Sequence, residues 1–177
     1  MERIIRLTYA STATFKNNQS GGIEADVARI LVQSRNNNSR AKVGGVLHYG
    51  NGYFFQCLEG ETSKVNETYN RISKDPRHKN VQLLAAENIG HRMFSDWSMK
   101  YMPIESSIKT LLEKYGYETF DPYKFDAQFV EQLLAQCVKG VDLTESVITN
   151  KSKLKLNNNA NDSAWSGLMA KLKRVFS

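Results

Sequence analysis

The hydrophobic positions of the first hundred residues follow two different spacings. Runs rich in apolar, β-branched and aromatic residues predict strands over residues 4–11, 43–49, 52–60, 81–89 and 97–102. Apolar residues at helical spacing predict an amphipathic helix over 23–35, and Val65, Tyr69 and Ile72 predict a second one. The order β-α-β-β-α-β(-β) predicts an α+β, ferredoxin-like fold, in which a mostly antiparallel sheet carries both helices on one face.

Turn-forming residues separate these elements. Asn36-Asn37-Asn38 follows the first helical pattern, and because asparagine favours caps and turns, we expect the helix to end there. Gly50-Asn51-Gly52 predicts a hairpin turn between two strands. Pro76 is expected to close the second helix, since proline disfavours helical geometry in the residue before it.

Beyond Pro103 the apolar residues recur only at helical spacing. One stripe contains Ile108, Leu111, Leu112 and Tyr115, and a longer one contains Phe125, Phe129, Leu133, Leu134 and Cys137. We expect both stripes to pack on the uncovered face of the sheet. The chain is thus predicted to divide into a sheet domain (1–102), a helical cap (103–148), a flexible linker (149–163) and an amphipathic basic helix (164–177).

The pattern of the last helix is compatible with three roles. It fits a packed terminal helix or a contact in a homo-oligomer. Its amphipathic face behind a tether also fits a helix that binds a partner. Its lysines and Trp165 would also suit attachment to a membrane surface.

Composition narrows the class of protein. The chain has 177 residues, 41% of them hydrophobic and 24% charged, which is ordinary for a globular protein. The net charge is +6, but the basic residues of the sheet domain do not form an arginine-rich stripe. We therefore expect no direct contact with nucleic acid. Cys57 and Cys137 have no metal or redox spacing and predict buried free thiols. No apolar run is long enough to cross a membrane and no signal peptide opens the chain, so we expect a cytoplasmic location.

The histidines are few and scattered, so they do not predict a metal site. His48 and His91 are expected to face solvent or to lie at the edge of the sheet.

Gln56 is the most unusual position, because its amide interrupts the apolar strand Phe54-Phe55-Gln56-Cys57-Leu58. A buried amide left without partners costs roughly 1–3 kcal/mol, so a polar group of the protein or of a ligand must meet it. In a split βαβ fold the first and third strands are central neighbours, so Tyr9 is expected to meet Gln56 beneath the helices. No acid–base pair, metal cluster or nucleophile accompanies them, which favours binding of a planar, hydrogen-bonding molecule over hydrolysis.

Several short motifs resemble those of one family over roughly residues 2–102. They are Tyr9-Ala10-Ser11, Asn37-Asn38, Gly44-Gly45-Val46-Leu47, Phe54-Phe55-Gln56-Cys57-Leu58-Glu59-Gly60, Asp75-Pro76-Arg77-His78 and Trp97-Ser98-Met99. Together they resemble the BLUF domain, the blue-light sensor that uses flavin. The C-terminal part is similar to the helical cap of short, stand-alone members.

The resemblance implies noncovalent FAD held between the two helices, with Tyr9 and Gln56 as the photoactive pair. In the family's mechanism, Tyr9 passes an electron and a proton toward the excited flavin. Gln56 then changes rotamer or tautomer and strengthens a hydrogen bond to the flavin C4 carbonyl. An amide suits this role, since its two ends differ in donor and acceptor character.

The resemblance also assigns roles to further residues. The implied cofactor contacts, besides Tyr9 and Gln56, are Ser11, Ile30, Asn37, Asn38, Ile72, Arg77 and His78. Asn37 and Asn38 correspond to the contacts at the flavin ring, Ile30 and Ile72 to the residues that sandwich it. Trp97 and Met99 correspond to the signal relay into the last strand. A turn that ends the helix would by itself explain an asparagine at position 38, without a flavin contact.

We therefore expect a blue-light photoreceptor without enzymatic activity of its own. It would signal to an unidentified downstream protein, such as a transcriptional regulator, and could form a homo-oligomer. The alternative is a flavin- or nucleotide-dependent enzyme on a ferredoxin-like fold, although a phosphate-binding glycine loop and a catalytic base are not evident. A structural adaptor that has lost its flavin is a third class, against which Tyr9, Asn38 and Gln56 argue.

Overall fold

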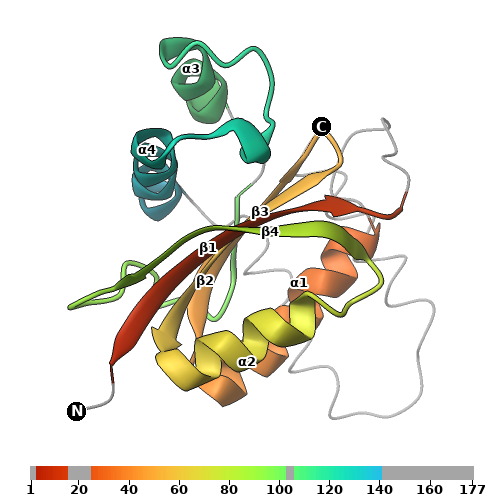
Figure 1. Ribbon diagram of the computed structural model, residues 1–177, viewed down its shortest axis with the longest axis vertical. Helices are drawn as coiled ribbons and strands as arrows, with labels where there is room; N and C mark the ends of the chain where they lie inside the picture. The colour runs from red at the N-terminus through yellow and green to blue at the C-terminus, as the bar shows by residue number, and fades with distance from the viewer. Residues whose placement is uncertain (1–2, 16–24, 103–105, 141–177) are drawn as a thin grey trace.

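A five-stranded sheet separates two layers of helices (Figure 1). The computed structural model describes residues 3–15, 25–102 and 106–140. The predicted linker (149–163) and basic helix (164–177) lie outside these residues.

The elements follow the predicted order. They are β1 (Ile4–Ala13), α1 (Ala25–Ala41), β2 (Gly44–Gly50), β3 (Tyr53–Glu61), α2 (Thr62–Ile72), β4 (His78–Asn88), β5 (Lys100–Met102), α3 (Ser106–Lys114), the 3-10 helix η1 (Pro122–Lys124) and α4 (Ala127–Lys139). The strands lie side by side in the order β4-β1-β3-β2-β5, and only the β2–β5 pair is parallel. The predicted α+β, ferredoxin-like fold with β1 and β3 as central neighbours is confirmed.

Each face of the sheet has its own hydrophobic core. Successive side chains of a strand point to opposite faces, so Leu7, Tyr9 and Leu58 pack toward α1 and α2. Phe55 and Cys57 pack on the other face, together with apolar residues of α3 and α4. Figure 1 shows the two pairs of helices on opposite sides of the sheet, as predicted for the cap.

Helix α1 does not end at Asn36-Asn37-Asn38 but continues to Ala41, so that expectation was wrong. The Asn38 side chain bonds to the distant Ser98 carbonyl and therefore does not compete for the helix backbone. The helix ends instead where Lys42 takes a positive φ of 54°. There Lys42 N donates to Ser39 O and Val43 N donates to Asn38 O, which are the two hydrogen bonds of a Schellman motif.

Two strands differ in length from the prediction. Strand β4 begins at His78 rather than at residue 81 and ends one residue before Ile89. Strand β5 contains only residues 100–102, because it pairs with β2 only from Val46 to His48. Trp97 and Met99 therefore lie in the segment before β5 and not within it.

His48 is fully buried, so the prediction of a solvent-facing or edge position was wrong. Strand β2 lies between β3 and β5, and the cap covers this face, with the Phe120 ring centred 4.2 Å from the imidazole. Burial lowers the pKa of His48 to about 4, although its hydrogen bond to Met102 O acts in the opposite direction. His91 is exposed, as predicted.

Cys57 and Cys137 are both buried and free, as predicted. Burial raises the pKa of the Cys137 thiol to about 12, and that of Cys57 further still. Of the helices in the described ranges, none has the length and apolar character needed to cross a membrane.

Candidate functional site

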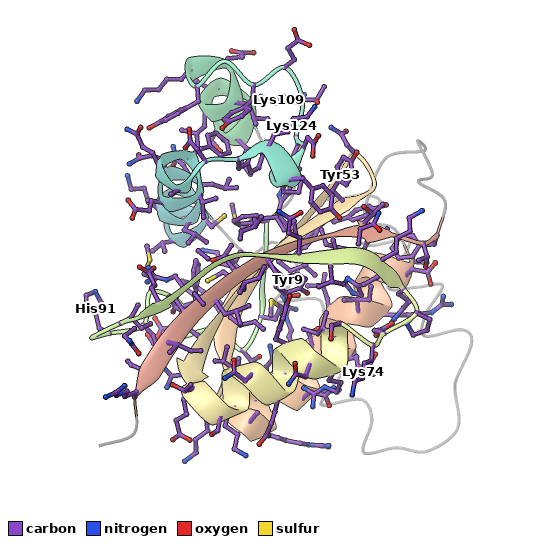
Figure 2. All side chains as sticks on the ribbon, in the orientation of Figure 1. Tyr9, Tyr53, Lys74, His91, Lys109 and Lys124 are labelled. Carbon is purple, nitrogen blue, oxygen red and sulfur yellow. The ribbon has the colours of Figure 1, made fainter. Side chains whose placement is uncertain are left out.

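Tyr9 and Gln56 meet on the helix-covered face of the sheet, as predicted. They are paired directly across β1 and β3, and the Tyr9 hydroxyl donates a hydrogen bond to Gln56 Oε1. Gln56 Nε2 lies 3.5 Å from Met99 Sδ, to which it donates. Figure 2 shows Tyr9 between the sheet and the helices α1 and α2. Both ends of the Gln56 amide therefore have protein partners.

The Tyr9 phenol is fully buried, and this burial raises its pKa well above the ordinary value. Nearby Tyr69 and Asp75 raise the pKa further. The Tyr69 ring lies edge-on to the Tyr9 ring with centroids 5.4 Å apart. Tyr9 is therefore a protonated hydrogen-bond donor at neutral pH.

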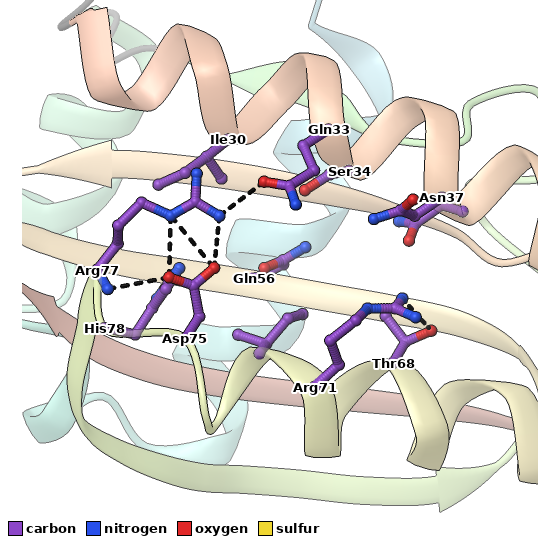
Figure 3. Close-up of a pocket in the computed structure, with 12 residues that line it drawn as sticks. Ile30, Gln33, Ser34, Asn37, Gln56, Thr68, Arg71, Asp75, Arg77 and His78 are labelled. Carbon is purple, nitrogen blue, oxygen red and sulfur yellow. Dashed lines mark hydrogen bonds and ion pairs between the residues drawn. The ribbon is translucent and has the colours of Figure 1, made fainter.

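A pocket lies between α1 and α2, with the Gln56 side chain at its floor (Figure 3). Most residues that the resemblance assigns to a cofactor line it: Ile30, Asn37, Asn38, Gln56, Ile72, Arg77 and His78. Tyr9 and Ser11 are not among the residues that line it. Tyr9 contacts Gln56, and Ser11 Oγ lies 2.8 Å from His78 Nδ1, so each supports a lining residue.

The pocket also contains residues that the sequence analysis did not select. They are Gln33, Ser34, Thr68, Arg71 and Asp75. Helical periodicity could have found four of them, because Gln33, Ser34, Thr68 and Asp75 each lie three or four positions from Ile30 or Ile72. Ile30 and Asn37, for example, bracket Gln33 and Ser34. Arg71 directly precedes Ile72, and this spacing does not single it out.

At one end of the pocket, a polar network joins α1 to the segment between α2 and β4. Arg77 Nε lies 2.9 Å from Asp75 Oδ1, and Arg77 Nη2 lies 2.7 Å from Gln33 Oε1 on α1. Figure 3 shows these contacts as dashed lines. The Arg77 hydrogen bond holds the pKa of Asp75 below its ordinary value, while burial lowers the pKa of His78 to about 4. The network thus contains an ion pair beside a neutral imidazole.

Helix α1 fixes the segment that precedes β5. Asn38 Nδ2 donates to Ser98 O at 2.9 Å, and Arg35 Nε donates to Met99 O at 2.8 Å. These contacts hold Met99 against Gln56, where its side chain is buried. Trp97 is only partly buried and packs against the core on the cap side. The structure therefore has Met99, and not Trp97, next to the amide.

The sequence model of one protein family matches most of the sheet domain. The family is described as sensors of blue light using FAD (BLUF), and the match covers residues 4–100. This defines the class as flavin-using light sensors. The chain belongs to the BLUF family.

Similar proteins also have light-dependent functions in their names. The chain is 33% identical over 112 residues to photoactivated adenylate cyclase subunit beta of Euglena longa, a match that covers 60% of this chain and 13% of that protein. It is 35% identical over 63 residues to the blue light- and temperature-regulated antirepressor BluF of Escherichia coli, covering 36% and 16% of the two chains. The chain thus spans about an eighth of the length of the cyclase subunit.

Solved structures of short family members are similar over most of their length. The photo-activated state of BlsA has a TM-score of 0.73 and 34% identity, covering 78% of this chain and 97% of that one. The dark state of BlrB, a BLUF protein, has a TM-score of 0.63 and 28% identity, covering 80% and 99%. The cap is therefore included in the similarity.

Proposed function

We propose that this protein is a blue-light photoreceptor that binds FAD in the pocket between α1 and α2 and signals through protein contacts. The observation that carries this proposal is the position of Gln56. The Gln56 amide lies at the floor of the pocket, with the Tyr9 phenol at one end and the Met99 thioether at the other. The chain belongs to a family described as using FAD, so this pocket is the proposed flavin site.

The residues of the pocket fit a flavin. Ile30 and Ile72 line it from the two helices that flank it, and apolar side chains suit the faces of a planar ring. The amides of Asn37 and Asn38 offer donors and acceptors for the polar edge of the ring. Arg77 offers a cation for the phosphates. When bound, the flavin supplies absorption of blue light and a site that accepts an electron.

Tyr9 and Gln56 would supply the rest of the photochemistry. The raised pKa of Tyr9 keeps its proton on the hydroxyl, so the proton leaves only when the ring loses an electron. The hydrogen bond to Gln56 Oε1 provides a path for that proton. A flip or a change of tautomer of Gln56 would exchange donor and acceptor at Tyr9, at Met99 and at the pocket without moving the backbone.

The output is proposed to be a change in protein contacts rather than catalysis by this chain. The named relatives include cyclases and an antirepressor, so the family is used with different effectors. We propose a downstream protein, such as a transcriptional regulator, as the partner, since an antirepressor is among the relatives. The buried free thiols of Cys57 and Cys137 suit the reducing cytoplasm, the location that we propose.

Absorption spectroscopy of the purified protein tests the proposal. We expect a yellow protein whose bound flavin is released as FAD on denaturation. Blue light should shift its absorption to longer wavelength, and the shift should reverse in darkness. A colourless protein would contradict flavin binding. A yellow protein whose spectrum does not respond to light would contradict photoreception and favour the alternative of a flavin enzyme.

A further inference from the structure

Lys100 is a fully buried lysine on the face of β5 that the cap covers. A buried ammonium group is stable only when other groups replace its hydration. Lys100 Nζ donates to the Val138 carbonyl at 3.0 Å and lies 4.1 Å from the centroid of the Trp97 ring. The Val138 carbonyl belongs to the last turn of α4, where the negative end of the helix dipole attracts a cation. The indole face adds a cation–π interaction.

The same end of α4 packs closely on β5 at a second point. Gly140 caps the helix, with its N donating to Gln136 O at 3.0 Å. A Cβ at Gly140 would lie 2.3 Å from Cε and 2.9 Å from Sδ of Met102, which shows how little space separates them. Met102 lies two residues after Lys100 and therefore on the same face of β5. Two neighbouring side chains of β5 thus contact one end of α4.

On the opposite side, the segment before Lys100 is connected to the candidate site. Met99 precedes Lys100, and its sulfur accepts the hydrogen bond from Gln56 Nε2. A continuous path therefore leads from Gln56 through Met99 and Lys100 to Val138. This path passes from one face of the sheet to the other between Met99 and Lys100, because consecutive side chains of an extended chain point to opposite faces.

We propose that Lys100 is the positioning residue that transmits a change at Gln56 to the last turn of α4. A rearranged Gln56 releases Met99, and a shift of the backbone there moves the ammonium group away from Val138 O or from the Trp97 ring. Because the group is buried, it loses interactions that water does not replace, and the last turn of α4 opens more often. This inference rests on the proposed photoreceptor function and adds the site of output, the turn Cys137–Gly140.

Hydrogen exchange of the full-length, FAD-loaded protein in darkness and under blue light tests this role. In the wild type we expect light to increase exchange at the amides of 137–140 by about tenfold. In Lys100→Met the red shift of the flavin should persist, while the light-dependent difference at 137–140 should disappear. Lys114→Met is the matched control, since Lys114 is an exposed cap lysine whose Nζ lies over the Tyr115 ring. It should behave as the wild type.

The possible outcomes are separable. A wild type without a red shift would overturn the photoreceptor function and this inference with it. A red shift without any change at 137–140, or a full change in Lys100→Met, would overturn only the role of Lys100. If Lys100→Met does not retain flavin, Lys100→Gln provides the test, because it keeps a donor but not the charge. A light-dependent difference of wild-type size in Lys100→Gln would overturn the role of the ammonium group.

Discussion

Tyr9 and Gln56 lie directly opposite each other on β1 and β3, and the Tyr9 hydroxyl donates its hydrogen bond to Gln56 Oε1. The other end of the same amide donates to Met99 Sδ. The two ends of the amide differ in hydrogen-bonding character and bond to different segments of the chain, so a change at one end alters the bond at the other. The following predictions separate the contributions of this pair from those of its surroundings.

Tyr9→Phe should bind FAD but lose the light-induced red shift, because the proposed donor hydroxyl is absent. The measurement is the difference spectrum before and after blue light. Tyr53→Phe is the control, since Tyr53 lies on β3 and its ring contacts Tyr123 of the cap segment rather than the pocket. It should keep the full shift. A red shift of wild-type size in Tyr9→Phe would show that Tyr9 is not the required donor.

Arg77→Gln should weaken FAD binding by about tenfold or more, since a hydrogen bond to a charged group contributes roughly 1.5–3 kcal/mol. Riboflavin lacks phosphates, so its affinity should change little. Titration of the flavin-free protein with both ligands measures the difference. Arg29→Gln is the control, because Arg29 forms an exposed ion pair with Asp26 on α1. An equal loss of affinity for riboflavin would place Arg77 at the ring rather than at the phosphates.

The free energy of unfolding should decrease as the pH falls from about 6.5 toward 4. The pKa values of His48 and His78 are both lowered from 6.5 to about 4 in the folded protein, chiefly by burial. The unfolded chain therefore takes up protons first as the pH falls, and stability present above pH 6.5 is lost across this window. Each histidine accounts for about 2 to 3 kcal/mol at pH 4.5.

Urea unfolding at a series of pH values measures this loss. His48→Asn removes one titrating group, and its amide nitrogen corresponds in position to Nδ1, the atom that bonds to Met102 O, so its stability should depend less steeply on pH. Identical pH dependence in this variant and in the wild type would show that His48 does not contribute.

Gly45→Ala should destabilise the protein by about 3 kcal/mol or more, because overpacking against a backbone that is held by the sheet is costly. A Cβ at Gly45 would lie 2.0 Å from the Cys57 carbonyl oxygen on the neighbouring strand. Gly52→Ala is the control: its φ of 79° is unfavourable for alanine, but nothing lies within 4 Å of a Cβ there. It should lose only about 1 kcal/mol. Thermal unfolding of both variants tests the difference. An equal loss of stability in the two variants would contradict the close approach of Gly45 to the Cys57 carbonyl oxygen.

Sequence patterns predicted the fold well where the determining signal is local. The apolar and β-branched runs of β1 and β3 and the helical spacing in α1 and α2 are properties of short segments, so they can be recognised without knowing which segments pack against them. The pairing of Tyr9 with Gln56 followed from the order of elements, since a split βαβ sheet places the first and third strands side by side. The amide of Gln56 was conspicuous because it interrupts an apolar strand.

The wrong predictions concern residues whose surroundings are set by segments distant in the sequence. Asn36-Asn37-Asn38 was expected to end a helix, but the Ser98 carbonyl, 60 residues beyond Asn38, occupies its side chain. His48 was expected near solvent, but the cap residue Phe120 covers it. In each case the local preference was overridden by a partner that is remote in the sequence.

The amino-acid pattern was therefore sufficient for the elements, their order and the central pair of the candidate site, because periodicity and turn chemistry act over a few residues. Only the three-dimensional arrangement showed that Met99 lies beside Gln56, that Arg77 bonds to Gln33 of α1, and that Lys100 is buried against the end of α4. Burial and hydrogen-bond partners depend on which segments the folded chain brings together. Lys100 and Val138, for example, are 38 positions apart in the chain but 3.0 Å apart at their bonded atoms.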